Sequence, residues 1–174
     1  MNRNGNLAPG TVYTARISQA ATDSNGVPLT PAASWSFTTQ APPTVTATTP
    51  EANTTGVAVN VSPTATFSRA MSAATLTTST ANVRPQSGGN AVSAVVSYDS
   101  ANSRVTINPN SNLSLGTAYL VTITTGATAS DGIALASNHT WTFTTITAPT
   151  VTATSPAAHA TGVGTNDDST ATFP

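Results

Sequence analysis

Apolar and polar residues alternate with a period of two along much of the chain, most regularly between residues 41 and 146. Because successive side chains of a β-strand point to opposite faces, this alternation predicts strands with one buried face. The intervening positions are mainly Thr and Ser, whose branched or small side chains suit a solvated pleated face. The apolar positions that we expect to face a common core are Val45, Ala47, Ala65, Phe67, Val92, Ala94, Val96, Tyr98, Val105, Ile107, Tyr119, Val121, Ile123, Trp141 and Phe143.

Short clusters of turn-forming residues separate these runs, at 87–90, 99–102 and 131–132. Gly, Asn, Asp and Ser favour tight or left-handed backbone at such places. The best helical candidate, 69–77, is short and rich in Ser and Thr, so we expect one helical turn at most. Seven or eight short strands joined by turns predict an all-β chain folded as an antiparallel β-sandwich of two sheets.

The sequence repeats itself without a gap at a shift of 106 residues, because residues 6–39 align with 112–145 and residues 43–57 with 149–163. The repeated positions include large aromatic residues, such as Trp35 with Trp141 and Phe67 with Phe173. A disordered Thr/Ser-rich stalk has no reason to hold such residues in register. The repeat therefore predicts folded units of about 100 residues, the size of a seven-strand sandwich.

The period divides the chain into one complete copy at 41–146, the C-terminal half of a copy at 1–40, and the N-terminal strands of a further copy at 147–174. Neither partial copy is long enough to bury its aromatic residues alone, since pieces below about 40 residues rarely fold without staples. The complete copy between them also makes pairing within one chain improbable. Two interpretations stay open: a segment of a longer tandem-repeat protein, or subunits that polymerise head to tail by strand complementation.

Several motifs of the complete copy, taken in order, resemble a bacterial Ig-like domain of the kind found in S-layer proteins and repetitive surface adhesins. They are Pro43-x-Val45-x4-Pro50, Thr55-Gly56-Val57, Phe67-Ser68-x2-Met71, Leu113-x2-Gly116-Thr117-x-Tyr119, Asp131-Gly132 and Trp141-x-Phe143-Thr144-Thr145. The resemblance implies an Ig-like β-sandwich and a secreted or cell-surface structural module without an active site. In the third copy Pro174 stands where the motif has Ser68, so the motif is lost there.

The tyrosine of the fourth motif, Tyr119, follows a tight turn at the start of a strand, and Tyr13 recurs at the same place in the first partial copy. This arrangement resembles a tyrosine corner, in which the ring packs inward and the hydroxyl bonds back to the backbone. We therefore predict a structural role for both tyrosines.

Charge is scarce: the chain has Lys+Arg 5, Asp+Glu 6 and a formal net charge of −1. Binding of nucleic acids or anionic membranes needs clustered Lys or Arg, so we predict no nucleic-acid partner. No apolar run reaches the roughly 18–20 residues that span a bilayer and the N-terminus lacks a signal-peptide pattern, so we expect no membrane insertion. The chain contains 36 Thr and 19 Ser but no Cys and no Lys, so disulfides, Lys–Asn isopeptide bonds and sortase-type linkage have no reactive group here.

Few residues are candidates for chemistry. The two histidines, His139 and His159, have no partner at metal-ligand spacing. Asp23 and Asp131 begin stretches that resemble the start of a calcium loop, but no Glu follows at the required place, so we interpret both as turn initiators. The pair at 167–168, Asp167 and Asp168, has the carboxylates for an interdomain calcium ion, although we favour a solvated loop. We predict no catalytic, cofactor-binding or metal-binding residue.

Four N-x-S/T sequons begin at Asn53, Asn60, Asn112 and Asn138. Chance explains most of them in a chain this rich in Ser and Thr.

Together with these patterns, the resemblance implies a non-enzymatic extracellular or cell-surface protein that forms part of a fibre, stalk or surface layer. Its expected partners are neighbouring Ig-like repeats or identical subunits, in a filament or array. The alternative is an adhesin module that recognises a surface glycan or another surface ligand. Low aromatic content, 5% of residues, disfavours sugar stacking because the repeated aromatic residues are needed for the core.

Overall fold

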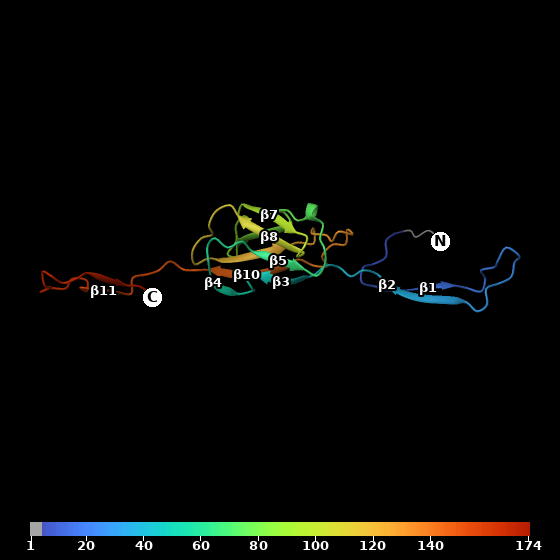
Figure 1. Cartoon of the computed structure of the whole chain (residues 1–174), viewed down its shortest axis with the longest axis horizontal. Coiled ribbons are helices and arrows are strands. Elements are labelled where there is room, and N and C mark those ends of the chain that lie inside the picture. Colours follow the sequence, from blue (N-terminus) through green and yellow to red (C-terminus); the bar gives the residue numbers. More distant parts are fainter. Residues whose placement is uncertain (1–4) are drawn as a thin grey trace.

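The computed structural model describes residues 5–174 and contains one complete β-sandwich between two separate hairpins (Figure 1). The N-terminal hairpin consists of β1 (Val12–Ile17) and β2 (Ala33–Thr38), and the C-terminal hairpin of β11 (Ala153–Ser155) and β12 (Thr170–Thr172). The sandwich strands are β3 (Val45–Thr49), β4 (Thr54–Val57), β5 (Thr64–Phe67), β6 (Ala81–Pro85), β7 (Ala94–Asp99), β8 (Arg104–Pro109), β9 (Ala118–Ile123) and β10 (His139–Thr145). The two hairpins lie at opposite ends of the sandwich.

The sandwich has two four-stranded sheets, with strand orders β4-β10-β9-β6 and β3-β5-β8-β7. This confirms the predicted all-β, Ig-like architecture. All strand pairs of the described chain are antiparallel except β4 and β10, which run parallel. The exception arises where the chain leaves the sheet β3-β5-β8-β7 after β3 and crosses to the other sheet as β4, through a turn with Asn53 at φ 65°.

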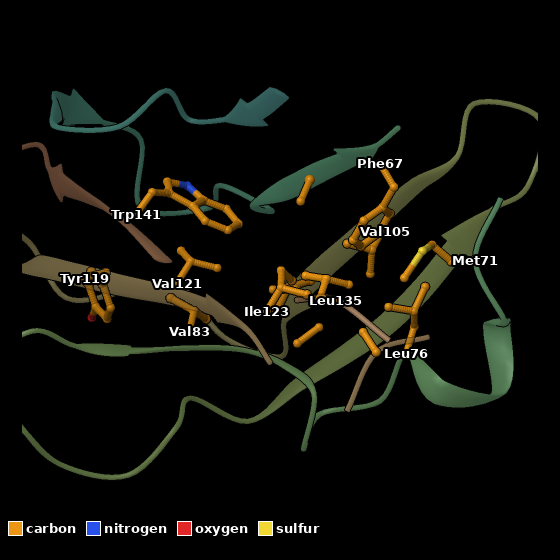
Figure 2. Packing of buried hydrophobic residues seen from close by; sticks show 14 of the residues in the cluster. Phe67, Met71, Leu76, Val83, Val105, Tyr119, Val121, Ile123, Leu135 and Trp141 are labelled. Atoms are coloured by element: carbon orange, nitrogen blue, oxygen red, sulfur yellow. The ribbon is translucent and has the colours of Figure 1, made fainter. Parts of the chain in front are cut away.

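Side chains from both sheets meet in one hydrophobic core, shown in Figure 2. Trp141, Val121 and Val83 come from one sheet, and Phe67 and Val105 from the other. Each is 4% exposed or less. The predicted apolar positions of β5, β8, β9 and β10 are all buried, because the period-two pattern places them on one face of each strand.

The predicted inward position of Ala47 is wrong. A bulge between Val45 and Ala47 shifts the register of β3 against β5, so Ala47 is exposed and Thr48 takes the half-buried place. A bulge inserts one extra residue and thereby reverses the alternation beyond it.

Outside the strands, the region at 69–77 holds a single 3-10 turn, Ala73–Thr75, which confirms the expectation of one helical turn at most. No helix among residues 5–174 is long and apolar enough to cross a membrane.

The structure confirms the tyrosine corner. The N–H of Ser114 donates to the hydroxyl of Tyr119 at 2.9 Å, and the Tyr119 ring stacks on Phe143 with centroids 5.7 Å apart. In the N-terminal hairpin, the N–H of Ala8 donates to the Tyr13 hydroxyl at 2.9 Å, and Tyr13 stacks on Phe37 at 6.0 Å. The hairpin therefore carries the local geometry of β9–β10 without the rest of a sandwich.

Candidate functional site

The N-terminal hairpin presents an apolar face. Its register places Tyr13 opposite Phe37 and Ala15 opposite Trp35, and cross-strand partners in an antiparallel pair share a face. We call Tyr13, Ala15, Trp35 and Phe37 the N-terminal face. The opposite side of the hairpin is polar, with Thr14 and Ser36 in hydroxyl contact at 3.1 Å. The hairpin thus has the two-sided pattern of a sheet built to cover a core.

This N-terminal face is open to solvent. Trp35 is 53% exposed, whereas Trp141, at the same place of the sequence repeat, is 4% exposed. The exposed fractions differ because the sheet containing β5 and β8 covers Trp141, whereas the described chain places no strand over Trp35. At about 25 cal/mol per Å² of apolar surface, covering half of an indole side chain is worth on the order of 2 kcal/mol.

The C-terminal hairpin has a matching apolar face, formed by Val151, Ala171 and Phe173, which we call the C-terminal face. Its register, Thr154 with Ala171, reproduces that of Thr48 with Ala65 in the sandwich. Phe173 is 57% exposed, while its counterpart Phe67 is 3% exposed. The two hairpins therefore correspond to opposite sheets of one sandwich, β9–β10 and β3–β5.

The hairpins also have unpaired strand edges. In the sandwich β9 pairs with β6, β10 pairs with β4, and β5 pairs with β8. Within residues 5–174 the corresponding strands β1, β2 and β12 pair only inside their own hairpins. Such edges present free backbone N–H and C=O groups to any strand that can align with them.

A polar clamp ties the linker that follows the N-terminal hairpin to the sandwich. The guanidinium of Arg69 donates to the carbonyl of Ala41 in the linker at 2.8 Å and forms an ion pair with Asp131 in the 129–135 loop. The sequence analysis did not identify Arg69 as important, because 62 residues separate it from Asp131 and no local pattern links them.

A cavity of about 670 Å³ lies beside this clamp, lined from the hairpin side by Leu7 and Pro9 and from the sandwich side by Asp131 and Ile133. The cavity exists because a segment that packs beside the equivalent residue of the complete sandwich has no counterpart in the described part of this unit. In the sandwich the N–H of Leu113, the counterpart of Leu7, donates to Val59 at 2.8 Å, but no described segment takes that place beside Leu7. The cavity therefore lies between the N-terminal hairpin and the 129–135 loop, at the place where the incomplete unit lacks this segment.

The aspartates predicted to initiate turns do so. Asp23 accepts the N–H groups of Asn25 and Val27, both at 2.9 Å, and these hydrogen bonds lower the pKa of its carboxyl. Asp131 accepts the N–H of Ile133 at 3.2 Å in the same manner. Asp167 accepts the N–H of Gly164 at 2.8 Å in an exposed loop that also contains Asp168.

The histidines lie in different settings. His139 is half-buried at the start of β10, and the centroid of its ring lies 5.9 Å from that of Trp141. His159 lies in an exposed turn with a backbone φ of 63°. Among residues 5–174, no three His, Cys, Asp or Glu side chains gather where they could hold a metal ion.

The four sequon asparagines lie in exposed positions. The Asn53 side-chain oxygen accepts the Thr142 hydroxyl at 2.9 Å, and that of Asn138 accepts the Thr125 N–H at 2.9 Å. Asn60 and Asn112 line a small polar cavity of about 220 Å³.

Hydroxyl groups form one row across the sheet β3-β5-β8-β7. The register aligns Thr49 with Thr64, Thr64 with Thr106, and Thr106 with Ser97. Their neighbours Ala65, Val105 and Val96 face the core, so the row faces outward. Sequence reasoning identified the Thr-rich strands but not this row, because the register between strands is not readable from one strand alone.

Comparison with known proteins identifies the family of the chain. The model of a family described as "Bacterial Ig-like domain" matches residues 1–39 and again residues 40–145. No curated protein matches the chain.

Two solved structures resemble the fold. The crystal structure of PcoC, a methionine-rich copper resistance protein from Escherichia coli, is 21% identical with a TM-score of 0.50, and the match covers 60% of this chain and 99% of PcoC. The N-terminal part of the bacterial S-layer protein SbsC is 17% identical with a TM-score of 0.48, over 63% of this chain and 25% of that one. At this identity the likeness to PcoC concerns the fold alone, and this chain contains only two methionines.

Proposed function

Because the chain belongs to the bacterial Ig-like domain family, we propose that it is a non-enzymatic structural element of the bacterial cell surface or extracellular space. Domains of this family are generally non-catalytic. In the proposed role the sandwiches act as rigid units of a fibre, stalk or surface layer, joined end to end.

One observation carries this proposal: the family model matches the chain twice, over residues 1–39 and again over residues 40–145. Consecutive copies of one fold, joined by a short linker, favour an extended, end-to-end arrangement of units. The Arg69 clamp supports the same role, because it ties the linker to the sandwich and limits bending at the junction.

A glycan-binding adhesin is the second candidate, and the outward row of Thr49, Thr64, Thr106 and Ser97 favours it. Aligned hydroxyls offer regularly spaced donors and acceptors for sugar hydroxyls. A glycan array would test this role with the wild type and a Thr64→Val, Thr106→Val variant. Binding by the wild type that the variant loses would support the adhesin.

Surface location is the direct test of the structural role. Antibodies against residues 41–146 should label intact cells of the source bacterium, or the shed extracellular material, as strongly as permeabilised cells. Electron microscopy should place the label on fibres, stalks or a surface layer. Labelling that appears only after permeabilisation would contradict the proposal.

A further inference from the structure

We propose that the complete sandwich bears tension between its two linkers, and that the parallel pair of β4 and β10 is the element that resists this tension. The inference deepens the proposed structural role and rests on it, because units joined end to end transmit any pulling force from one unit to the next. It assigns a mechanical function to one strand pair of the sandwich.

The path of the chain sets the direction of the load. The chain enters and leaves the sandwich at opposite ends (Figure 1). It enters at the start of β3, continues through the turn at 50–53 into β4, and leaves at the end of β10. A force on the two linkers therefore pulls β4 through its first residue and β10 through its last residue. Because the two strands are parallel neighbours, these forces act in opposite directions along the same strand axis.

Such a load acts as shear on the hydrogen bonds between β4 and β10. At one end of the pair the Asn53 N–H donates to the Thr142 carbonyl at 2.7 Å, and at the other end the Ile146 N–H donates to the Val57 carbonyl at 2.8 Å. The Thr142 hydroxyl adds a bond to the Asn53 side chain at 2.9 Å. Sliding of one strand along the other strains all of these bonds together, so none can break first and relieve the rest.

The strand that precedes β4 resists in the same way. The pull on the first linker slides β3 along β5, its antiparallel neighbour. The Ser68 N–H donates to the Thr44 carbonyl at 2.9 Å, and the Thr44 N–H donates to the Ser68 hydroxyl at 3.0 Å. Val45 of β3 and Val57 of β4 pack against the buried core, so sliding also exposes apolar surface to water.

Pulling one molecule in two directions tests this inference. The chain contains no Cys, so a pair of introduced cysteines defines where DNA handles attach in an optical trap. Gln40→Cys with Ala148→Cys pulls along the linkers. Ser93→Cys with Ser111→Cys pulls apart the open end of the β7–β8 hairpin, where the strand pairs break one after another. We expect the rupture force along the linkers to be the higher one. An equal or lower force along the linkers would overturn the inference.

Two proline variants test the strand pair itself. Ile146→Pro removes the N–H that donates to Val57 in the loaded pair. Gln86→Pro removes an N–H that donates to Ala118 at 2.8 Å beside β6, at the far edge of the same sheet. Both residues are exposed, so the two variants lose the same kind of contact.

The variants should differ under load. With handles on the linkers and at a fixed force, Ile146→Pro should unfold about fivefold faster than the parent, which corresponds to about 1 kcal/mol, the net contribution of one backbone hydrogen bond. Gln86→Pro should unfold at the rate of the parent. Urea denaturation without force checks that both variants fold. Equal acceleration of the two variants, or no acceleration of Ile146→Pro, would overturn the assignment to β4 and β10.

Failure here is distinguishable from failure of the proposed function. Surface labelling of cells combined with a rupture force that does not depend on direction overturns the tension-bearing role and leaves the structural one. High resistance along the linkers combined with labelling confined to permeabilised cells overturns the proposed location and leaves a mechanically resistant sandwich.

Discussion

Trp35 and Trp141 occupy the same place in two hairpins 106 residues apart, each opposite a small or aliphatic residue, Ala15 or Val121, yet their environments are opposite. Trp141 lies in the core of a complete sandwich, and Trp35 lies on a face that nothing in residues 5–174 covers. The pair shows that the local sequence forms the hairpin, whereas burial of its apolar face requires the second sheet.

The hydroxyl of Thr145 provides a first prediction. Its O–H donates to the Ser114 carbonyl at 2.6 Å, its oxygen accepts the Thr117 N–H at 3.0 Å, and the residue is buried. Thr145→Val leaves both backbone groups without this partner, so we expect a loss of about 2–3 kcal/mol in the free energy of unfolding. Urea denaturation followed by fluorescence of the buried Trp141 would measure it.

Thr39 offers the matched control for that variant. Its hydroxyl donates to Ala8 at 2.7 Å and accepts from the Thr11 N–H at 2.9 Å, but water reaches these groups in the hairpin. Thr39→Val should change the unfolding free energy of the sandwich by less than about 0.5 kcal/mol. Equal losses in the two variants would contradict the assignment of the sandwich as the cooperative unit.

Arg69 provides a second prediction, about orientation. Arg69→Ala removes the contacts to Ala41 and Asp131, so the N-terminal hairpin should tumble more independently of the sandwich. Nitrogen-15 relaxation would show this as shorter correlation times for β1 and β2 amides than for β9 and β10 amides. Arg104→Ala, which removes an exposed pair 3.8 Å from Asp99, should leave the correlation times unchanged.

The same clamp gives a pH dependence. The Arg69 guanidinium hydrogen-bonded to Asp131 lowers the pKa of that carboxyl, and the Ile133 N–H adds to the effect. A lowered pKa means that the carboxylate contributes stability above the ordinary Asp value of about 3.9 and loses it as pH falls through the lowered pKa.

Asp131→Asn tests this dependence. The variant should unfold at lower urea than the wild type at pH 7, and the two midpoints should converge as pH falls from about 4 towards 2. A difference between midpoints that stays constant down to pH 2 would contradict the role of the Asp131 charge.

Much of the fold was predictable from the sequence because the period-two alternation of β5, β8, β9 and β10 fixes which side chains face inward. The strands β4 and β6 were not identified. β4 is four residues with Gly56 at φ 69°, and β6 is short and ends at Pro85, so neither shows a long alternation. The bulge in β3 also reverses the alternation at a point that the sequence does not mark.

The candidate interface was predictable in outline and not in detail. The repeat identified Trp35 and Phe173 as core residues outside the complete copy, and the structure gives their exposure. The Arg69 clamp and the hydroxyl row depend on contacts between distant segments, and their partners become visible only once the register of the sheets is known.

The most direct test of the account follows the exposure of Trp35 itself. Trp141→Phe leaves Trp35 as the sole tryptophan of the chain, since the sequence contains two. In dilute solution its emission should be that of an indole in water and readily quenched by acrylamide. The reverse variant, Trp35→Phe, leaves Trp141 alone, and its emission should be shifted to the blue and protected from acrylamide because Trp141 is 4% exposed. Equal emission maxima and equal quenching in the two variants would contradict the claim that only the complete sandwich buries this position.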